Sequence, residues 1–468
     1  MEQAKQANPQ QTLSVFDAVT IMVGIVVGIG IFKTPALVAG NVDSEAAFLG
    51  VWVAGGILTL IGALCYAELA AAHPHAGGEY HFLGRAYGKS MAVLFGWARG
   101  SVIQTGAIAA VAFVLGDYAQ QLAPIGPFGS AIYAAMSIIA LTALNVAGTI
   151  QSKTLQIGVT FVEVGLIAAI IIWGFLGSTD APAPAVTTTP ESAALGLAMI
   201  FVLLTYGGWN EAAYLSGELK DPARNMARVL VIGTAVLVTL YLLANAALLA
   251  ILGLDGLRGS QAVATDMMRL VAGDAGAFIV GLAIVVAALS TLNATIFTGA
   301  RVYFAMARDI TLLPRVGQWD ERGRAPANGL LAQGAVALLL VALGAASRDG
   351  FQAMVDYSAP VFWAFLFLVG LALPILRWRE PDRALPFRVP LYPLTPALFC
   401  LSCLYMLHAS LAYTGNGAFI GLGVVLAGLP LLLFQRRQPA AAGPAPTLLA
   451  PAAIAPAHHP EFVPQGER

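Results

Sequence analysis

The chain has 468 residues, of which 58% are hydrophobic and only 10% are charged, and its net charge is −1. Its mean hydropathy is +0.78. About a quarter of the residues of a soluble globular domain are charged, so this composition excludes a soluble domain and indicates a membrane protein. The net charge and the absence of a basic run give no sign of a nucleic-acid partner.

Apolar segments of about 20 residues, the length needed to cross a bilayer, recur along most of the sequence. The N-terminus lacks the charged start of a cleavable signal, so the first segment is expected to be retained. We predict twelve spans, at about 15–39, 47–71, 91–120, 128–146, 154–177, 194–217, 226–253, 276–306, 328–346, 353–376, 393–413 and 416–434. Residues 1–13 are expected to form a cytoplasmic tail. The Ala- and Pro-rich residues 436–468 are expected to form a disordered cytoplasmic tail.

The lysines and arginines predict the orientation. With the N-terminus inside, the cytoplasmic loops hold most of them, whereas the outer loops hold only Arg258, Arg269 and Arg348. Both termini are then cytoplasmic. This topology fits two five-span units of opposite orientation, at about 14–177 and 194–376, followed by two extra spans within 393–434.

Two of the predicted spans are interrupted near their middles. The first contains Gly28-Ile29-Gly30 with Pro35 further on, and the sixth contains Tyr206-Gly207-Gly208-Trp209. Lipid offers no hydrogen-bond partner to a freed peptide group, so such breaks are tolerated where they line a cavity, and broken spans in corresponding halves indicate a transporter's substrate site. The N–H groups near Ile29 and Gly30 are candidates for binding a carboxylate. The carbonyls of Val26, Val27, Leu204 and Gly207 are candidates for binding an amine.

Other chemistry is not indicated. Cys65, Cys400 and Cys403 lie in apolar segments and are expected to be buried thiols, and His73, His75 and His81 lack metal-site spacing. No arrangement of a nucleophile with a base is present, so neither an enzyme nor a cofactor is expected. Glu68 and Glu79 are expected to be structural or gating residues near the cytoplasmic side. Lys33 is expected to snorkel to the outer surface.

Four segments together resemble the amino acid–polyamine–organocation permeases, especially the L-type amino acid transporter branch and its bacterial relatives. They are VGIGIF at 27–32, AELAAAHPHAGGEYHFLGRAYG at 67–88, FVLLTYGGWNEAAYLSGELKDPARN at 201–225 and LSTLNATIFTGARVYFAMARD at 289–309. The resemblance covers residues 14–435. It implies an all-α fold of the leucine-transporter type, with a five-plus-five inverted repeat and twelve helices. It also implies alternating access to an amino acid held by the first and sixth helices.

The resemblance assigns roles to individual positions. Gly28, Ile29 and Gly30 match the carboxylate-binding turn, and Val26, Leu204 and Gly207 match carbonyls that take the amine. Leu204 replaces an aromatic residue that often closes the site, and Tyr206 or Trp209 would then have to cover the ligand.

Glu163 stands where sodium-independent relatives often carry a lysine. A carboxylate buried in mid-span is costly, which favours the neutral form unless a cation pairs with it, so Glu163 is a candidate for proton coupling. Arg99 and Lys33 are the candidate partners, and Ser290, Thr291 and Asn293 are the candidate polar neighbours. A structural ion pair or polar network is the alternative.

We therefore expect a sodium-independent amino acid permease of the cytoplasmic membrane, proton-coupled or exchanging. An antiporter of polyamines or cationic amino acids with the same fold stays open as the alternative, and a transporter-like amino acid sensor is a remote one. No outer loop contains cysteine, so a disulfide-linked heavy chain is not expected.

Overall fold

The computed structural model describes residues 11–28, 30–75, 77–147, 153–177, 194–310, 327–413 and 415–435, and these residues are almost entirely helical. The first half contains α1 (Val15–Val26), α2 (Gly30–Ala39), α3 (Glu45–Ala72), α4 (Gly78–Tyr87), α5 (Lys89–Ala98), the π-helical turn η1 (Arg99–Ile103), α6 (Gln104–Leu122), α7 (Gly129–Val146) and α8 (Lys153–Leu176). The second half contains α9 (Leu195–Thr205), the 3-10 helix η2 (Trp209–Gly217), α10 (Pro222–Gly259), α11 (Val263–Asp309), α12 (Ala327–Ala345), α13 (Gly350–Arg379), α14 (Leu394–Tyr413), α15 (Gly415–Leu426) and η3 (Leu429–Phe434).

The helices of the described residues are long and apolar enough for a multi-pass membrane protein. Ten continuous helical stretches of the described residues pass that test, including Lys89–Leu122, which joins α5, η1 and α6, and Gly417–Phe434, which joins α15 and η3. The bent pair of α1 and α2 raises the number to eleven. The remaining predicted span corresponds to α9 and η2, and α9 alone has 11 residues, which is too short to cross a bilayer. The prediction of an all-α polytopic protein is confirmed.

The first predicted break is present and bends the chain sharply. Helix α1 begins at a capping box formed by Ser14 and Asp17, and α2 leaves it at an angle of 48°. The Gly28 N–H bonds to the Val26 carbonyl at 2.6 Å, which is a tight turn and not a helical bond. Ile29 lies outside the described residues. The glycines thus end one helix and start another inside the predicted first span.

The second predicted break is also present. Helix α9 ends at Thr205, and Gly208 has a φ of 101°, in the left-handed region that favours glycine. After this residue the chain continues as η2, a 3-10 helix, and not as an α-helix.

The two broken segments run antiparallel and are joined at both ends. At one end, Leu13 pairs with Leu219, with the Leu13 N–H donating to Glu218 O at 3.0 Å. At the other end, the Ala194 N–H donates to Asn41 O at 3.1 Å. Between them, the hydroxyls of Thr34 in α2 and Thr205 in α9 lie 2.6 Å apart. The unwound midpoints therefore face each other.

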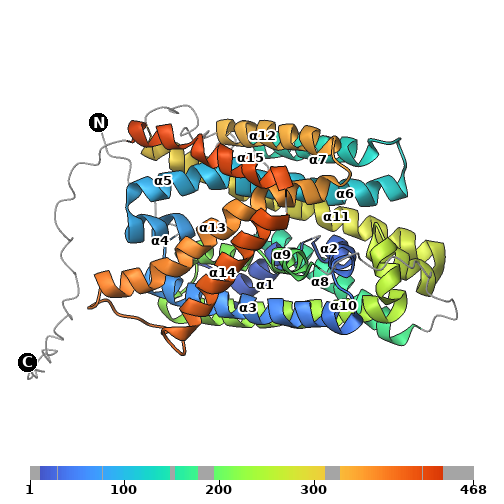
Figure 1. The fold of residues 1–468 in the computed structure, drawn as a ribbon, viewed down its shortest axis with the longest axis horizontal. Coiled ribbons are helices and arrows are strands. Elements are labelled where there is room, and N and C mark those ends of the chain that lie inside the picture. Colours follow the sequence, from blue (N-terminus) through green and yellow to red (C-terminus); the bar gives the residue numbers. More distant parts are fainter. Residues whose placement is uncertain are drawn as a thin grey trace, which may run out of the picture. The chain divides into compact units, whose positions relative to one another are not determined.

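Long helices surround this pair (Figure 1). Helices α3 and α10 pack along each other, α10 also packs against α1, and α6 packs against α7, α11 and α13. The third span contains the π-helical turn η1, where the Gly100 and Ser101 carbonyls accept from the hydroxyls of Tyr303 and Tyr357 at 2.6 and 2.9 Å. A π-helical turn leaves backbone groups to be satisfied from outside the helix, and these tyrosines supply the donors.

Candidate functional site

A cavity of about 260 Å³ lies between the two breaks and helices α6, α11 and α13. Both unwound segments contribute to its wall. Among the residues assigned to substrate binding, those that line it are Val26, Gly28, Gly30, Leu204, Gly207 and Gly208. The glycines of both predicted breaks therefore lie together in one wall of the cavity.

The glycines allow the two backbones to come close. A Cβ added to Gly208 would lie 3.3 Å from Val26 Cγ2, and one added to Gly30 would lie 3.4 Å from Thr205 Cγ2. Peptide groups are therefore available to a ligand at this wall with few side chains in between. That is the property required for binding by backbone dipoles.

Two of the carbonyls expected to bind an amine, those of Val26 and Leu204, already accept hydrogen bonds. The Val26 carbonyl accepts from the Tyr241 hydroxyl at 2.7 Å and from the Gly28 N–H at 2.6 Å. Both of its lone pairs are used, so it has none left for an amine in this conformation. The Leu204 carbonyl accepts from the Gly207 N–H at 3.0 Å and is also approached by the Tyr206 N–H. An amine would therefore have to displace a backbone donor at either carbonyl in this conformation.

Tyr206 and Trp209 do not line the cavity. Tyr206 is fully buried, and its ring packs against Trp52 and Tyr241 at centroid distances of 5.8 and 5.3 Å. The Trp209 ring packs against Tyr66 at 4.9 Å. The second break therefore directs both of its large aromatic side chains into the helix packing, and neither ring covers a ligand in this conformation.

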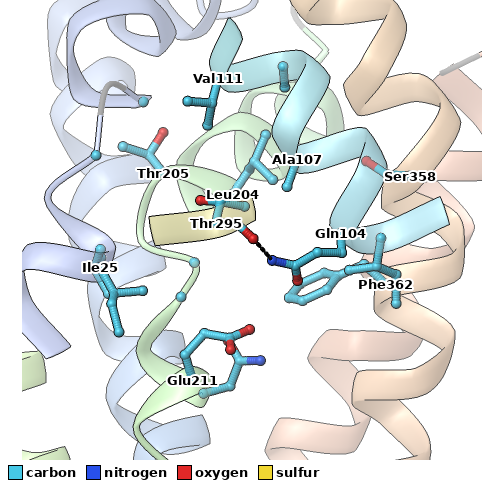
Figure 2. Close-up of a pocket in the computed structure, with 18 of the residues that line it drawn as sticks. Ile25, Gln104, Ala107, Val111, Leu204, Thr205, Glu211, Thr295, Ser358 and Phe362 are labelled. Carbon is cyan, nitrogen blue, oxygen red and sulfur yellow. Dashed lines mark hydrogen bonds between the residues drawn. The ribbon is translucent and has the colours of Figure 1, made fainter. Parts of the chain in front are cut away.

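The opposite wall is mostly apolar and comes from α6 and α13 (Figure 2). Figure 2 shows Ala107 and Val111 of α6 and Phe362 of α13 facing Ile25 and Leu204 across the cavity. Gln104 donates from its amide to Thr295 O at 3.0 Å and thereby joins α6 to α11. A ligand here would have its apolar parts against α6 and α13 and its polar parts against the unwound backbone.

One end of the cavity is lined by charged side chains. The sequence alone did not indicate that these residues belong to the site. Arg99 donates to Glu79 Oε2 at 2.9 Å and also to Glu211, and all three residues line the cavity. We call these three residues the Arg99 cluster. Glu79 accepts further bonds from Tyr66 at 2.6 Å, from Asn210 at 2.8 Å and from Tyr214 at 3.2 Å.

Glu79 lies in the first turn of helix α4. A signal for this was present: Glu79, Phe82, Leu83 and Ala86 recur at helical spacing, and all four are buried. The sequence did not indicate the role of Glu211, because this residue directly follows the break and resembles the polar residues that usually end a span.

The expectation that Lys33 reaches the outer surface is wrong. Lys33 is 4% exposed and forms ion pairs with Asp117 at 2.9 Å and Asp349 at 3.2 Å. We call these residues the Lys33 cluster. Arg99 and Asp117 are 18 residues apart on the third span, so at the helical rise the two clusters lie about 27 Å apart along that span.

Glu163 lies outside the cavity wall, on α8, which packs against α1 and α11. It is 3% exposed, and neither Arg99 nor Lys33 is its partner, since both pair elsewhere. The Thr291 hydroxyl reaches Glu163 Oε1 at 3.5 Å, and within the described ranges no hydrogen bond reaches Oε2. Asn293 instead accepts from Asn145 at 2.6 Å, and among the described residues no hydrogen bond joins Ser290 to Glu163.

Of the three cysteines expected to be buried, Cys65 and Cys403 are buried and Cys400 is only partly buried. Cys65, Cys400 and Cys403 are free thiols, and His75 and His81 stack with ring centroids 4.3 Å apart. In the part of the chain that the structure describes, no three potential ligands are grouped for a metal ion.

Comparison with known proteins identifies the family. The family model described as amino acid permease matches residues 13–430. The human b(0,+)-type amino acid transporter 1 is 27% identical over 419 residues, covering 87% of this chain and 84% of that protein. The serine/threonine exchanger SteT of Bacillus subtilis is 28% identical over 428 residues, covering 90% and 96%. The mouse large neutral amino acids transporter small subunit 2 is 28% identical over 436 residues, covering 90% and 80%.

These relatives agree with the resemblance to the L-type branch that the four sequence segments indicated. The family consists of permeases and not of enzymes, as the absence of a catalytic arrangement predicted. The chain belongs to the amino acid permease family and is an amino acid transporter with many membrane-spanning helices.

Proposed function

We propose that this transporter binds the carboxylate and amine of its amino acid substrate at the two facing breaks and carries it by alternating access. The observation that supports this is the cavity wall formed by Gly28 and Gly30 on one segment and by Gly207 and Gly208 on the other. Helix ends that meet from opposite directions present N–H groups for an anion and C=O groups for a cation.

The proposal includes the finer architecture. Twelve spans, the α9–η2 segment counted as one of them, form a five-plus-five inverted repeat with two extra helices. The antiparallel course of the two broken segments supports this arrangement. The excess of lysine and arginine in alternate loops supports the proposal that both termini lie in the cytoplasm of a bacterial-type cell.

We propose that transport is sodium-independent and that Glu163 couples it to protons, with exchange of amino acids as the other mode. Glu163 is buried beside Thr291, and no cation pairs with it in the described residues. A buried carboxyl group in this setting is more stable with its proton than without it. Loss and gain of that proton would alter the packing of α8 against α1.

A second candidate function is transport of cationic amino acids or polyamines. The charged lining of the cavity consists of Glu79 and Glu211 against Arg99, so the described wall carries one negative charge in excess when all three residues are ionised. A substrate with a second positive charge would find a complementary environment at that end.

The test uses the purified protein in liposomes and a thermal-shift screen of amino acids and polyamines. A bound substrate raises the melting temperature, because it stabilises the folded state. Gly30→Val is expected to abolish both the shift and uptake while the protein still inserts, because its Cβ would lie 3.4 Å from Thr205 Cγ2 and the methyl groups beyond it would force the two segments apart. Gly50→Val is the matched control, because Gly50 is exposed on α3 with no atom near its Cβ position.

Retained uptake in Gly30→Val would contradict the proposed site. A melting-temperature shift produced by polyamines and dibasic amino acids, and not by neutral ones, would select the second candidate.

A further inference from the structure

A second cavity, of about 270 Å³, lies at the membrane face where α3 and α13 end. It is close to the lower end of the size range of small-molecule pockets, about 300 Å³. Its wall combines His73 at the end of α3, Arg377 and Glu380 at the end of α13, and Arg383 and Arg388 from the chain that leads to α14. The transport cavity shares none of these residues.

The cavity has a positive charge in excess. Glu68 and Glu380 are its acidic lining residues, and both are already paired. Arg377 binds Glu68 through two bonds of 2.5 Å, and Glu380 accepts from Arg85 at 2.6 Å and from Arg383 at 3.3 Å. Among the described residues, no hydrogen bond or ion pair reaches the guanidinium of Arg388. Arg388 therefore lines the cavity as an exposed residue whose guanidinium donors make no bond within the described residues.

A buried polar atom in the same wall also lacks a partner. His73 is 4% exposed, and no group in the described residues bonds to its Nδ1. An unsatisfied buried ring nitrogen is uncommon and indicates a missing partner. Burial is the main cause that lowers the pKa of His73 to about 4, and the charge of Arg383 adds to it.

The surroundings of the cavity are typical of the membrane–water interface. Trp378 is 81% exposed and Leu391 75% exposed, and Tyr392, which lies under the Arg377 guanidinium at 3.9 Å, is 41% exposed. Exposed tryptophan and tyrosine mark the headgroup level of a bilayer. Under the orientation proposed above, this face is cytoplasmic, where basic pockets between helices bind anionic lipid headgroups.

We propose that this cavity binds a phosphate group, and that Arg388 and His73 are its primary contacts. An anionic phospholipid headgroup at the inner leaflet and a free phosphate in the cytoplasm offer the same chemistry to these donors. Arg377 already joins the end of α13 to Glu68 of α3. A ligand bound by His73 and Arg388 would add a second link between the end of α3 and the chain that follows α13.

The experiment measures binding to the full-length protein in a neutral detergent by native mass spectrometry and by thermal shift. One arm adds phosphatidylglycerol, with phosphatidylcholine as the neutral lipid, and the other adds inorganic phosphate. Arg388→Gln is expected to weaken binding about tenfold, the loss of one charge-assisted hydrogen bond. Arg379→Gln is the matched control, because Arg379 is exposed at the end of α13 and does not line the cavity.

Phosphatidylglycerol binding that falls in Arg388→Gln and not in Arg379→Gln supports a lipid headgroup site. Phosphate binding with the same dependence supports a site for a free anion. Equal binding by the wild type and both variants, or no binding of either probe by the wild type, would overturn the proposal. Amino acid uptake by Arg388→Gln is measured in parallel and is expected to persist, so failure of this proposal is distinguishable from failure of the transport site.

Discussion

Arg99 and Glu79, 20 residues apart on different helices, form a buried ion pair whose closest atoms, Nη1 and Oε2, are 2.9 Å apart. Because Arg99 also binds Glu211 at the second break, one guanidinium joins the third span, helix α4 and η2. The cavity is thus bounded at this end by an ionic contact that connects segments far apart in sequence.

The first prediction concerns this arginine. Arg99→Gln leaves Glu79 and Glu211 without their cation, and breaking a buried pair in this way costs about 3–5 kcal/mol. We expect a clear fall in melting temperature. The triple variant with Glu79→Gln and Glu211→Gln added removes the unpaired charges and is expected to recover most of the loss. Equal melting temperatures for Arg99→Gln and the wild type would show that the cluster adds nothing to stability.

The second prediction concerns the backbone at the break of the sixth span. Gly208 has a φ of 101°, and a side chain in the left-handed region costs about 1–2 kcal/mol. Gly208→Ala is therefore expected to lower the melting temperature and to weaken substrate binding together. Gly50→Ala, in the open helical face of α3, is the control and is expected to lower neither. Wild-type stability in Gly208→Ala would mean that the turn relaxes without strain.

The third prediction concerns Glu163. Glu163→Gln keeps the size of the side chain but holds no titratable proton, so uptake driven by a pH gradient should be lost in liposomes while exchange continues. Glu45→Gln, at the exposed start of α3, removes a carboxylate far from α8 and should leave both activities intact. Undiminished uptake driven by the pH gradient in Glu163→Gln would remove Glu163 as the coupling group.

The fourth prediction concerns pH and helix α4. Burial, with the neighbouring His75 and Arg85, lowers the pKa of His81 to about 4, below the value of about 6.5 for a free histidine. Between these values the unfolded chain binds a proton that the folded protein does not, so stability is present above about pH 6.5 and falls as the pH drops toward 4. His81→Gln is expected to reduce the fall of the melting temperature across this window. An unchanged slope would show that another group controls acid stability.

The sequence predicted the features that depend on local composition. Span positions follow from hydropathy, and both breaks follow from Gly28, Gly30, Gly207 and Gly208, because glycine weakens a helix wherever it stands. Partners were not predictable in the same way. Lys33 pairs with Asp117, which lies 84 residues further along the chain, and Arg99 pairs with Glu211, which lies 112 residues further along. The packing of helices decides such contacts, and no local pattern reports it.

Tyr206 and Trp209 illustrate the same limit within a recognised motif. Their spacing places them at the break, but a turn at Gly207 and Gly208 decides whether each ring faces the cavity or α3. Which face an aromatic residue takes depends on the rotation of a segment that is no longer a regular helix. Periodicity therefore has no predictive value there.

The main-chain bonds at Leu13 with Glu218 and at Ala194 with Asn41 tie the two interrupted segments together near both membrane surfaces. Neither segment can tilt far by itself without giving up peptide bonds that lipid would not replace. We therefore expect the two segments to move as one body, and under the proposed function a substrate bound between them would keep its contacts with both while the surrounding helices change the side to which the cavity opens.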